Sequence, residues 1–184
     1  MWGLRPRAID PSVPSLLAVA SAKTWLHNHM FNFLIIFFSQ YVLYLIAAGV
    51  FAWLFVKRKN VYAFIIVFAP AVFNRLVVTE IIRLFVYSAR PFVALHMTPL
   101  VSVSQREWYG SFPSGHAIFL FSLATSVWLY DKRFGAALYA LALAVGICRV
   151  FALLHWPADI FAGAVLGIIL TIGEITVFRR MHYA

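Results

Sequence analysis

Clusters of basic residues interrupt this chain, and the apolar segments between them are long enough to cross a lipid bilayer. The first such segment, Phe33 to Val56, contains no charged residue, and about 20 apolar residues suffice for a helix to cross the hydrocarbon core. Inside that core each backbone polar group needs a partner within the chain, so only helices and closed barrels can span it. The sequence therefore predicts an all-α integral membrane bundle.

We expect five transmembrane helices in this bundle. They cover residues 33–56, 61–87, 115–130, 135–153 and 157–178. The composition agrees, because 64% of the residues are hydrophobic and only 11% are charged, which lies far from the averages of soluble domains. A chain of 184 residues fits one domain, so residues 33–184 are expected to form a single membrane-embedded bundle.

Residues 1–32 are more polar than the rest and are predicted to form a separate N-terminal region. Their apolar stretch, Ser15 to Trp25, is short and is followed by His27, which favours a helix lying in the membrane interface. A sixth spanning helix is one alternative. A cleavable signal is another, because Arg5 and Arg7 precede the apolar run.

The net charge of +9 is explained by orientation in a membrane. Basic residues at 57–59, 132–133 and 179–180 follow the first, third and fifth predicted spans, as the positive-inside rule expects when all three clusters face the cytoplasm. No nucleic-acid partner is expected. The protein is predicted to be multi-pass in the plasma (inner) membrane, with residues 83–116 and the turn near 155 on the extracytoplasmic or periplasmic side.

Two arginines near the end of the second span are candidates for anion binding. Arg83 and Arg90 are seven residues apart, so they share one face for as long as the helix continues. A guanidinium group can bind two phosphate oxygens at once through two parallel hydrogen bonds. Pro91 is expected to mark the end of that helix. The alternative is that both side chains extend to the interface without a ligand.

The sequence Pro113-Ser114-Gly115-His116 precedes an apolar helix. Ser114 is a candidate N-cap, and Gly115 would let an anion approach the free amides of the first turn. His116 could donate a proton to a leaving oxygen. An ordinary capped helix with a histidine at the interface remains the alternative.

A third group of polar residues lies between the last two spans. His155 and Asp159 are four residues apart on either side of Pro157, so the carboxylate in the next helix can reach back to the imidazole. Such a partner would fix the tautomer of the histidine. Alternatively, Asp159 only complements the helix dipole. Arg149 would lie on a different helical face from His155, so a turn between them is required if both contact one ligand.

These three motifs, in this order, resemble the type 2 phosphatidic acid phosphatase superfamily of lipid phosphate phosphatases. That family has a lysine, six residues and Arg-Pro, then Pro-Ser-Gly-His, then Ser-Arg, five residues, His, three residues and Asp. The corresponding residues here begin at Arg83, Pro113 and Cys148. The resemblance covers residues 83–159 and implies a helical bundle.

The resemblance also implies a role for each motif residue. His155 would attack phosphorus to form a phospho-histidine, Asp159 would orient it, and His116 would protonate the leaving group. Phosphate binding would fall to Arg83, Arg90, Ser114, Gly115, Arg149 and Cys148. No metal and no other cofactor is expected, and only Asp159 of the six acidic residues lies in these motifs.

The chain departs from the family pattern at two positions. Arg83 replaces a lysine, which keeps the positive charge but changes its shape, and Cys148 replaces a serine with a weaker hydrogen-bonding group. A nucleophilic role for Cys148 is a competing hypothesis, against which stand its apolar helix and the lack of a glycine-rich cradle.

The Arg-Pro-Phe and Phe-Pro-Ser-Gly-His segments look most like those of bacterial undecaprenyl pyrophosphate phosphatases. The expected substrate is therefore a polyprenyl diphosphate, hydrolysed to the monophosphate. Phosphatidate or phosphatidylglycerophosphate is the alternative substrate, and a non-catalytic transporter or scaffold is the alternative class. Oligomeric state stays open. Structural pairing is expected for the remaining polar residues inside the spans, Asn74, Arg75, Glu80 and Glu174, and Glu80 is three residues from Arg83, with which it could form an ion pair.

Overall fold

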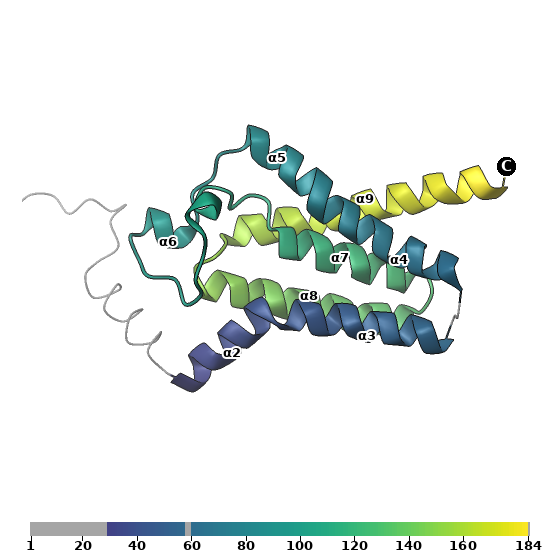
Figure 1. Ribbon diagram of the computed structural model, residues 1–184, viewed down its shortest axis with the longest axis horizontal. Coiled ribbons are helices and arrows are strands. Elements are labelled where there is room, and N and C mark those ends of the chain that lie inside the picture. The colour runs from purple at the N-terminus through teal and green to yellow at the C-terminus, as the bar shows by residue number, and fades with distance from the viewer. Residues whose placement is uncertain (1–28, 58–59, 184) are drawn as a thin grey trace, which may run out of the picture. The chain divides into compact units, whose positions relative to one another are not determined.

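The computed structural model describes residues 29–57 and 60–183, and its ordered elements are helices (Figure 1). The chain divides into two compact units, Met1–Leu34 and Ile35–Ala184. Of the first unit only residues 29–34 are described, at the start of helix α2, so the predicted interfacial helix and its cleavable alternative lie outside the described residues. The site and the packing described below belong to the second unit.

The helices are α2 (His29–Gln40), α3 (Val42–Lys57), α4 (Val61–Phe73), the π-helix η1 (Asn74–Val78), α5 (Thr79–Phe85), α6 (Pro91–Ala94), the 3₁₀-helix η2 (Gln105–Glu107), α7 (Gly115–Trp128), α8 (Lys132–Phe151) and α9 (Pro157–Tyr183). No strand occurs in the described part of the chain, where Ser88 and Gly110 form an isolated bridge. The all-α prediction is confirmed.

Helix α7 forms the centre of the bundle. It packs against α4, α8 and α9 (Figure 1), and most of its residues are buried. Close approach to α9 depends on glycine, since a Cβ added at Gly167 would lie 2.7 Å from the carbonyl oxygen of Ile118. The start of α7 is therefore held in the interior, where Ser114 is fully buried.

The prediction of five spanning helices is supported only in part. Among the described residues, three helices are long and apolar enough to cross a membrane, over Val61–Phe85, Lys132–Phe151 and Pro157–Met181, and α2 with α3 would make a fourth if the bent pair counts as one span. Helix α7 has 14 residues, so it is about 21 Å long. It begins after the Ser114 cap, as predicted, and ends at Trp128, two residues before the predicted end. The protein is a multi-pass membrane protein.

The segment predicted as one span over residues 33–56 bends by 49° between α2 and α3. Two side-chain contacts at Ser39 accompany the bend. The Ser39 hydroxyl donates to the carbonyl of Ile36, a contact that often bends helices, and Arg149 Nη1 donates to the Ser39 carbonyl over 2.7 Å. A guanidinium from α8 thus satisfies a backbone acceptor at the bend.

Helices α4, η1 and α5 form one continuous 25-residue helix that contains a π-helical turn. The turn starts at Asn74, four residues after Pro70, which cannot donate a backbone hydrogen bond. The Asn74 amide lies within hydrogen-bonding distance of Ser122, Thr171 and Glu174. The predicted structural pairing between helices is confirmed for Asn74 and Glu174.

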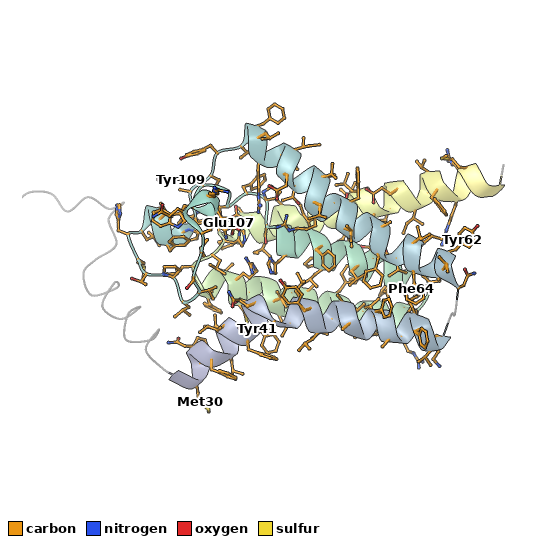
Figure 2. All side chains as sticks on the ribbon, viewed as in Figure 1. Met30, Tyr41, Tyr62, Phe64, Glu107 and Tyr109 are labelled. Atoms are coloured by element: carbon orange, nitrogen blue, oxygen red, sulfur yellow. The ribbon has the colours of Figure 1, made fainter. Side chains whose placement is uncertain are left out.

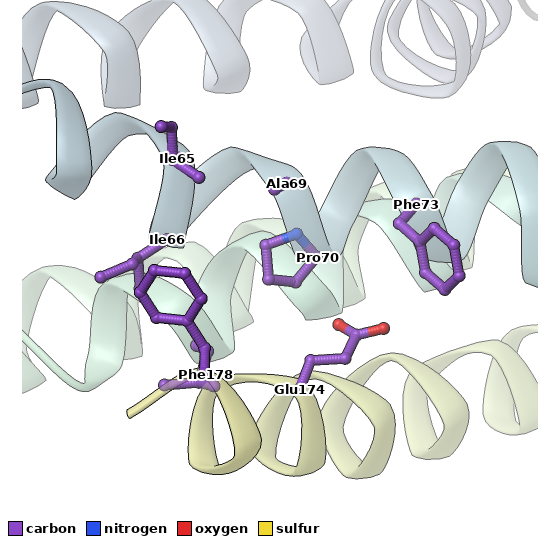
Figure 3. A pocket seen from close by; sticks show the side chains of 8 residues that line it. Ile65, Ile66, Ala69, Pro70, Phe73, Glu174 and Phe178 are labelled. Atoms are coloured by element: carbon purple, nitrogen blue, oxygen red, sulfur yellow. The ribbon is translucent and has the colours of Figure 1, made fainter. Parts of the chain in front are cut away.

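A pocket of about 290 Å³ lies between α4 and α9 beside this pairing (Figure 3). Its walls are apolar, from Ile65 to Phe73 on α4 and from Ile175 to Phe178 on α9, apart from the carboxylate of Glu174. None of the three motifs contributes to its lining.

The covering loop, residues 86–114, connects α5 to α7 and folds over one end of the bundle. It contains α6 and η2 and carries Glu107 and Tyr109, whereas Tyr62 lies at the other end (Figure 2). Helix α5 ends at Phe85 and Val86 is extended. The expectation that Pro91 marks the end of this helix is therefore wrong, because the helix ends five residues earlier than Arg90 and the backbone of Ser88 and Arg90 instead hydrogen-bonds with Tyr109, Trp108 and Ser111 of the loop.

Candidate active site

His155 lies in the turn that connects α8 and α9. Helix α8 ends with two crossed backbone bonds, from Leu154 to Arg149 and from Leu153 to Val150, which is the Schellman arrangement. Leu153 has a φ of 60°, a conformation that usually falls to glycine. This tight reversal brings His155 back beside Arg149, as the prediction of a turn between the two residues required.

The hydrogen bonds of His155 define its tautomer. Nδ1 lies 2.9 Å from the carbonyl oxygen of Ser111, and a carbonyl can only accept, so Nδ1 carries the proton. Nε2 lies 3.4 Å from Arg90 Nη1 and 3.4 Å from Arg149 Nη2, which can only donate. The imidazole is therefore protonated at Nδ1 only, and the lone pair of Nε2 faces the two guanidiniums.

Burial lowers the pKa of His155 below its ordinary value. The ring is 1% exposed, and the loss of hydration disfavours the imidazolium. The hydrogen bond with Asp159 acts in the opposite direction, while the charges of Arg149 and Arg90 add to the lowering. His155 is therefore neutral at physiological pH, which is the form with a free electron pair on Nε2.

Asp159 lies in the first turn of α9 and reaches His155, as predicted, but at a longer distance than Ser111 does. Its Oδ2 is 3.4 Å from His155 Nδ1, whereas the Ser111 carbonyl is 2.9 Å from the same atom. The carboxylate also accepts hydrogen bonds from the Ser111 hydroxyl and from the backbone of Trp156. Asp159 thus fixes the position of both Ser111 and the turn around His155.

The Arg90 side chain lies between Glu107, in the same covering loop, and the turn that carries His155. Its Nε donates to the carbonyl of Glu107 over 2.7 Å, and its Nη1 donates to the carbonyl of Leu154 over 3.0 Å. The Glu107 carboxylate lies 3.6 Å from Nη2. Burial lowers the pKa of Arg90, with a further contribution from the charge of Arg83. An anion bound here would restore favourable electrostatics around the buried guanidinium.

Arg149 projects from the last turn of α8 and is 7% exposed. Nη1 contacts the Ser39 carbonyl and Nη2 contacts His155. Its Nε is buried and has no hydrogen-bond partner among the described residues. A buried guanidinium with an unused donor is suited to bind a further oxygen atom.

The start of α7 has the predicted capping arrangement. The Ser114 hydroxyl accepts a hydrogen bond from the Ala117 amide, and α7 begins at Gly115. The Ser114 amide donates to the carbonyl of Asp159, so the first turns of α7 and α9 are joined. His116 follows in the first turn of α7.

A pocket of about 320 Å³ opens onto three of the motif side chains, Arg90, His116 and Arg149. Its remaining walls come from α2, α3, the covering loop and the α8–α9 turn. They are Gln40, Tyr41, Tyr44, Val101, Ser102, Val103, Glu107 and Leu154. The structure therefore brings residues from all three motifs to one opening.

Arg83 and Cys148 lie at the edge of this arrangement. Arg83 Nη2 donates to the carbonyl of Pro113 over 3.3 Å, and Nη1 forms the predicted ion pair with Glu80 over 3.0 Å. Cys148 is half-buried beside Arg149 but does not contribute to the lining of the pocket. The two departures from the family pattern therefore fall outside the immediate contacts of His155.

Sequence reasoning missed three residues of the site. Ser111 binds both His155 and Asp159, Glu107 binds Arg90, and the backbone of Ser39 binds Arg149. Three of these contacts use backbone carbonyls, which leave no signal in a sequence. The fourth contact uses a side chain, the Ser111 hydroxyl, which a sequence does record. Ser111 lies two residues before Pro113.

Three comparisons with known proteins place the chain in a family. The family model of the PAP2 superfamily matches residues 60–183. The bacitracin transport permease protein BcrC of Bacillus licheniformis is 34% identical over 146 residues, which cover 76% of this chain and 68% of that protein. The undecaprenyl-diphosphatase BcrC of Bacillus subtilis is 29% identical over 149 residues, or 78% of this chain and 73% of that one.

The crystal structure of Aquifex aeolicus LpxE shares the fold. The two structures have a TM-score of 0.66 and 24% identity, over 86% of this chain and 94% of that chain. The predicted resemblance is thus confirmed by both sequence and fold. Because the family match runs from the start of α4 through every motif residue to the end of α9, this chain belongs to the PAP2 superfamily and is a phosphatase.

Proposed function

We propose that this protein hydrolyses a polyprenyl diphosphate, such as undecaprenyl diphosphate, to the monophosphate through a phospho-histidine intermediate. The observation that carries the proposal is the environment of His155. Its Nδ1 proton is held by the Ser111 carbonyl, and its Nε2 faces the guanidiniums of Arg90 and Arg149 at 3.4 Å each. A nucleophile therefore points at the groups that would bind a phosphoryl group.

In the first step the Nε2 lone pair attacks the terminal phosphorus. The bond between that phosphorus and the bridging oxygen breaks, and its electron pair passes to the oxygen. His116, which lines the same pocket, protonates this oxygen as lipid monophosphate leaves. The imidazole becomes a positively charged phospho-histidine, and Asp159, at 3.4 Å from Nδ1, stabilises that charge.

In the second step water attacks the phosphorus of the phospho-histidine. His116 takes a proton from the water, the bond between phosphorus and Nε2 breaks, and inorganic phosphate is released. The electron pair returns to His155. His155 thus regains its free electron pair, and His116 regains the proton that it donated in the first step.

The phosphoryl oxygens would be held by Arg90 and Arg149 beside His155, and by Ser114, Gly115 and Arg83 at the start of α7. Phosphoryl transfer depends mainly on positioning and on stabilisation of charge. The side chains that surround Nε2 are cations, which repel a divalent metal ion but attract phosphate. We therefore infer a metal-independent reaction.

The relatives favour this substrate over the alternatives. One relative is named as an undecaprenyl-diphosphatase, whereas phosphatidate or phosphatidylglycerophosphate would fit the same phosphoryl site. A further relative is named as a transport permease, so a transporter is the alternative of another class. A transporter would not depend on the nucleophilicity of His155.

The site is inferred to face the extracytoplasmic side of the plasma (inner) membrane. Lys57, Lys132, Arg179 and Arg180 lie at the helix ends opposite to the α8–α9 turn (Figure 1), and positive residues favour the cytoplasmic side. Cysteine labelling tests this orientation. In a Cys148→Ser background, a membrane-impermeant thiol reagent added to intact cells should label Ser102→Cys and should not label Lys132→Cys. The reverse pattern would invert the topology.

The activity is tested by phosphate release in detergent from undecaprenyl diphosphate and phosphatidate, with and without a metal chelator. Wild type should release phosphate faster from the diphosphate, and chelation should not matter. His155→Ala should lower the rate by at least about 1,000-fold, and His116→Ala by about 100-fold or more. After acid-free quenching, wild type should carry phosphate on His155.

His96→Asn is the matched control, because His96 is exposed and has a φ of 52°, which asparagine tolerates. It should retain wild-type activity. A rate that chelation abolishes, or that His155→Ala leaves intact in a folded protein, would rule out the mechanism. Faster release from phosphatidate would instead favour the alternative substrate.

A further inference from the structure

Arg75 lies outside all three motifs, yet its side chain reaches the first residue of α7. A Cβ added at Gly115 would lie 2.5 Å from Arg75 Nε and 2.9 Å from its Cζ. The guanidinium therefore covers the same position at which the Pro-Ser-Gly-His motif offers its free amides. Arg75 reaches it from η1, the π-helical turn that redirects side chains within the α4–α5 helix.

Glu80 connects Arg75 to Arg83. Its Oε1 lies 2.8 Å from Arg75 Nη1 and 3.0 Å from Arg83 Nη1. Arg83 in turn contacts the Pro113 carbonyl. The arginines of the site thus form two pairs: Arg90 with Arg149 at His155, and Arg75 with Arg83 at the start of α7.

The second pair carries more positive charge than its carboxylate neutralises. One oxygen of Glu80 serves two guanidiniums, and both lie near the N-terminus of α7, whose dipole also presents positive charge. Without a ligand this arrangement is unfavourable, and an anion between the helix and the two guanidiniums would stabilise it. The Arg75 side chain is 33% exposed, so such an anion can reach it.

We propose that Arg75, positioned by Glu80, is a further anion-binding residue of this active site, and that it binds the second phosphate of a diphosphate substrate. The inference rests on the proposed function. Two linked phosphates match two pairs of guanidiniums, one at the nucleophile and one at Gly115. A monoester such as phosphatidate has no second phosphate that could engage Arg75.

Electrostatic coupling between the pairs agrees with this arrangement. The charges of Arg83 and Arg75 both contribute to the lowered pKa of Arg90, after the larger effect of burial. The two pairs therefore lie close enough for each to respond to charge at the other. Because the two phosphates are linked, binding of the second at Arg75 would hold the first near Arg90.

The test compares kcat/KM for undecaprenyl diphosphate and phosphatidate in wild type, Arg75→Gln and Arg75→Lys. Arg75→Gln should lower kcat/KM for the diphosphate about tenfold or more, mainly through KM, and should change that for phosphatidate by less than about threefold. Arg75→Lys should recover part of the loss, because it restores the charge. Arg133→Gln, which removes a cation from the other end of α8, should affect neither substrate.

A binding measurement separates this inference from the proposed function. Inorganic pyrophosphate should raise the thermal midpoint of wild type more than phosphate does, and Arg75→Gln should remove that difference. If wild type cleaves neither lipid, the proposed function fails and the pyrophosphate result alone decides the role of Arg75. Equal losses on both substrates, unchanged kinetics in Arg75→Gln, or no pyrophosphate effect in wild type would overturn the inference.

Discussion

The Nδ1 atom of His155 is 2.9 Å from the carbonyl oxygen of Ser111, a residue 44 positions earlier in the chain. This backbone contact, rather than the carboxylate of Asp159, is the shortest that the ring makes. It leaves Asp159 free to bind the Ser111 hydroxyl and the Trp156 amide. The tautomer of the proposed nucleophile thus depends on the covering loop, and Asp159 acts on it largely by holding that loop in place.

His155 should therefore be protonated at Nδ1 and stay neutral well into the acid range. In ¹⁵N-histidine NMR spectra, the signals absent from His155→Ala should show the Nδ1–H form from about pH 8 to about pH 5, because burial lowers the pKa. Since the folded-state pKa lies below the unfolded value of about 6.5, His155 contributes stability that is present above that pH and lost as the pH falls. A titration midpoint near that of free imidazole would contradict this.

Ser111→Ala should impair turnover while leaving the tautomer of His155 intact. The substitution keeps the backbone carbonyl but removes a hydrogen bond to the Asp159 carboxylate, so kcat should fall about tenfold with little change in KM. Steady-state phosphate release measures the effect. Ser104→Ala, at an exposed position of the same loop, is the control and should match wild type. A Ser111→Ala variant with full activity would show that Asp159 does not need this contact.

Arg149→Lys should lower both activity and stability. A lysine carries the charge but cannot contact the Ser39 carbonyl and His155 Nε2 at once, as the two Nη atoms of Arg149 do. We expect a loss of about 1–3 kcal/mol in the free energy of unfolding and at least a tenfold fall in kcat/KM. Thermal unfolding and phosphate release measure the two effects. Arg179→Lys, at an exposed site, should change neither.

Gly167→Ala should destabilise the bundle, whereas Gly173→Ala on the same helix should not. A Cβ at Gly167 would lie 2.7 Å from the Ile118 carbonyl oxygen, while a Cβ at Gly173 meets nothing within 4 Å. Overpacking between α7 and α9 should cost about 1–3 kcal/mol, and alanine at Gly173 should be neutral or stabilising by up to about 1 kcal/mol. Equal thermal midpoints for the two variants would show that α9 can shift away from α7.

The sequence alone established the helical membrane fold and the family, because both depend on information carried locally. Apolar segments of membrane length define helices, and the three motifs have fixed spacings that can be read from Arg83 to Asp159. Local signals also identified the Ser114 cap and the pairing of Glu80 with Arg83. The lengths of the helices are not carried locally in this way, since an apolar run such as 33–56 does not reveal a bend.

Only the tertiary structure decided which groups meet. The bend at Ser39 involves a guanidinium 110 residues away, and the partner of His155 is a backbone carbonyl that any residue at position 111 would provide. Arg75 reaches Gly115 because a π-helical turn changes its direction, which no periodic pattern records. Contacts between distant segments depend on how helices pack and turn, and the one-dimensional sequence does not specify those geometries residue by residue.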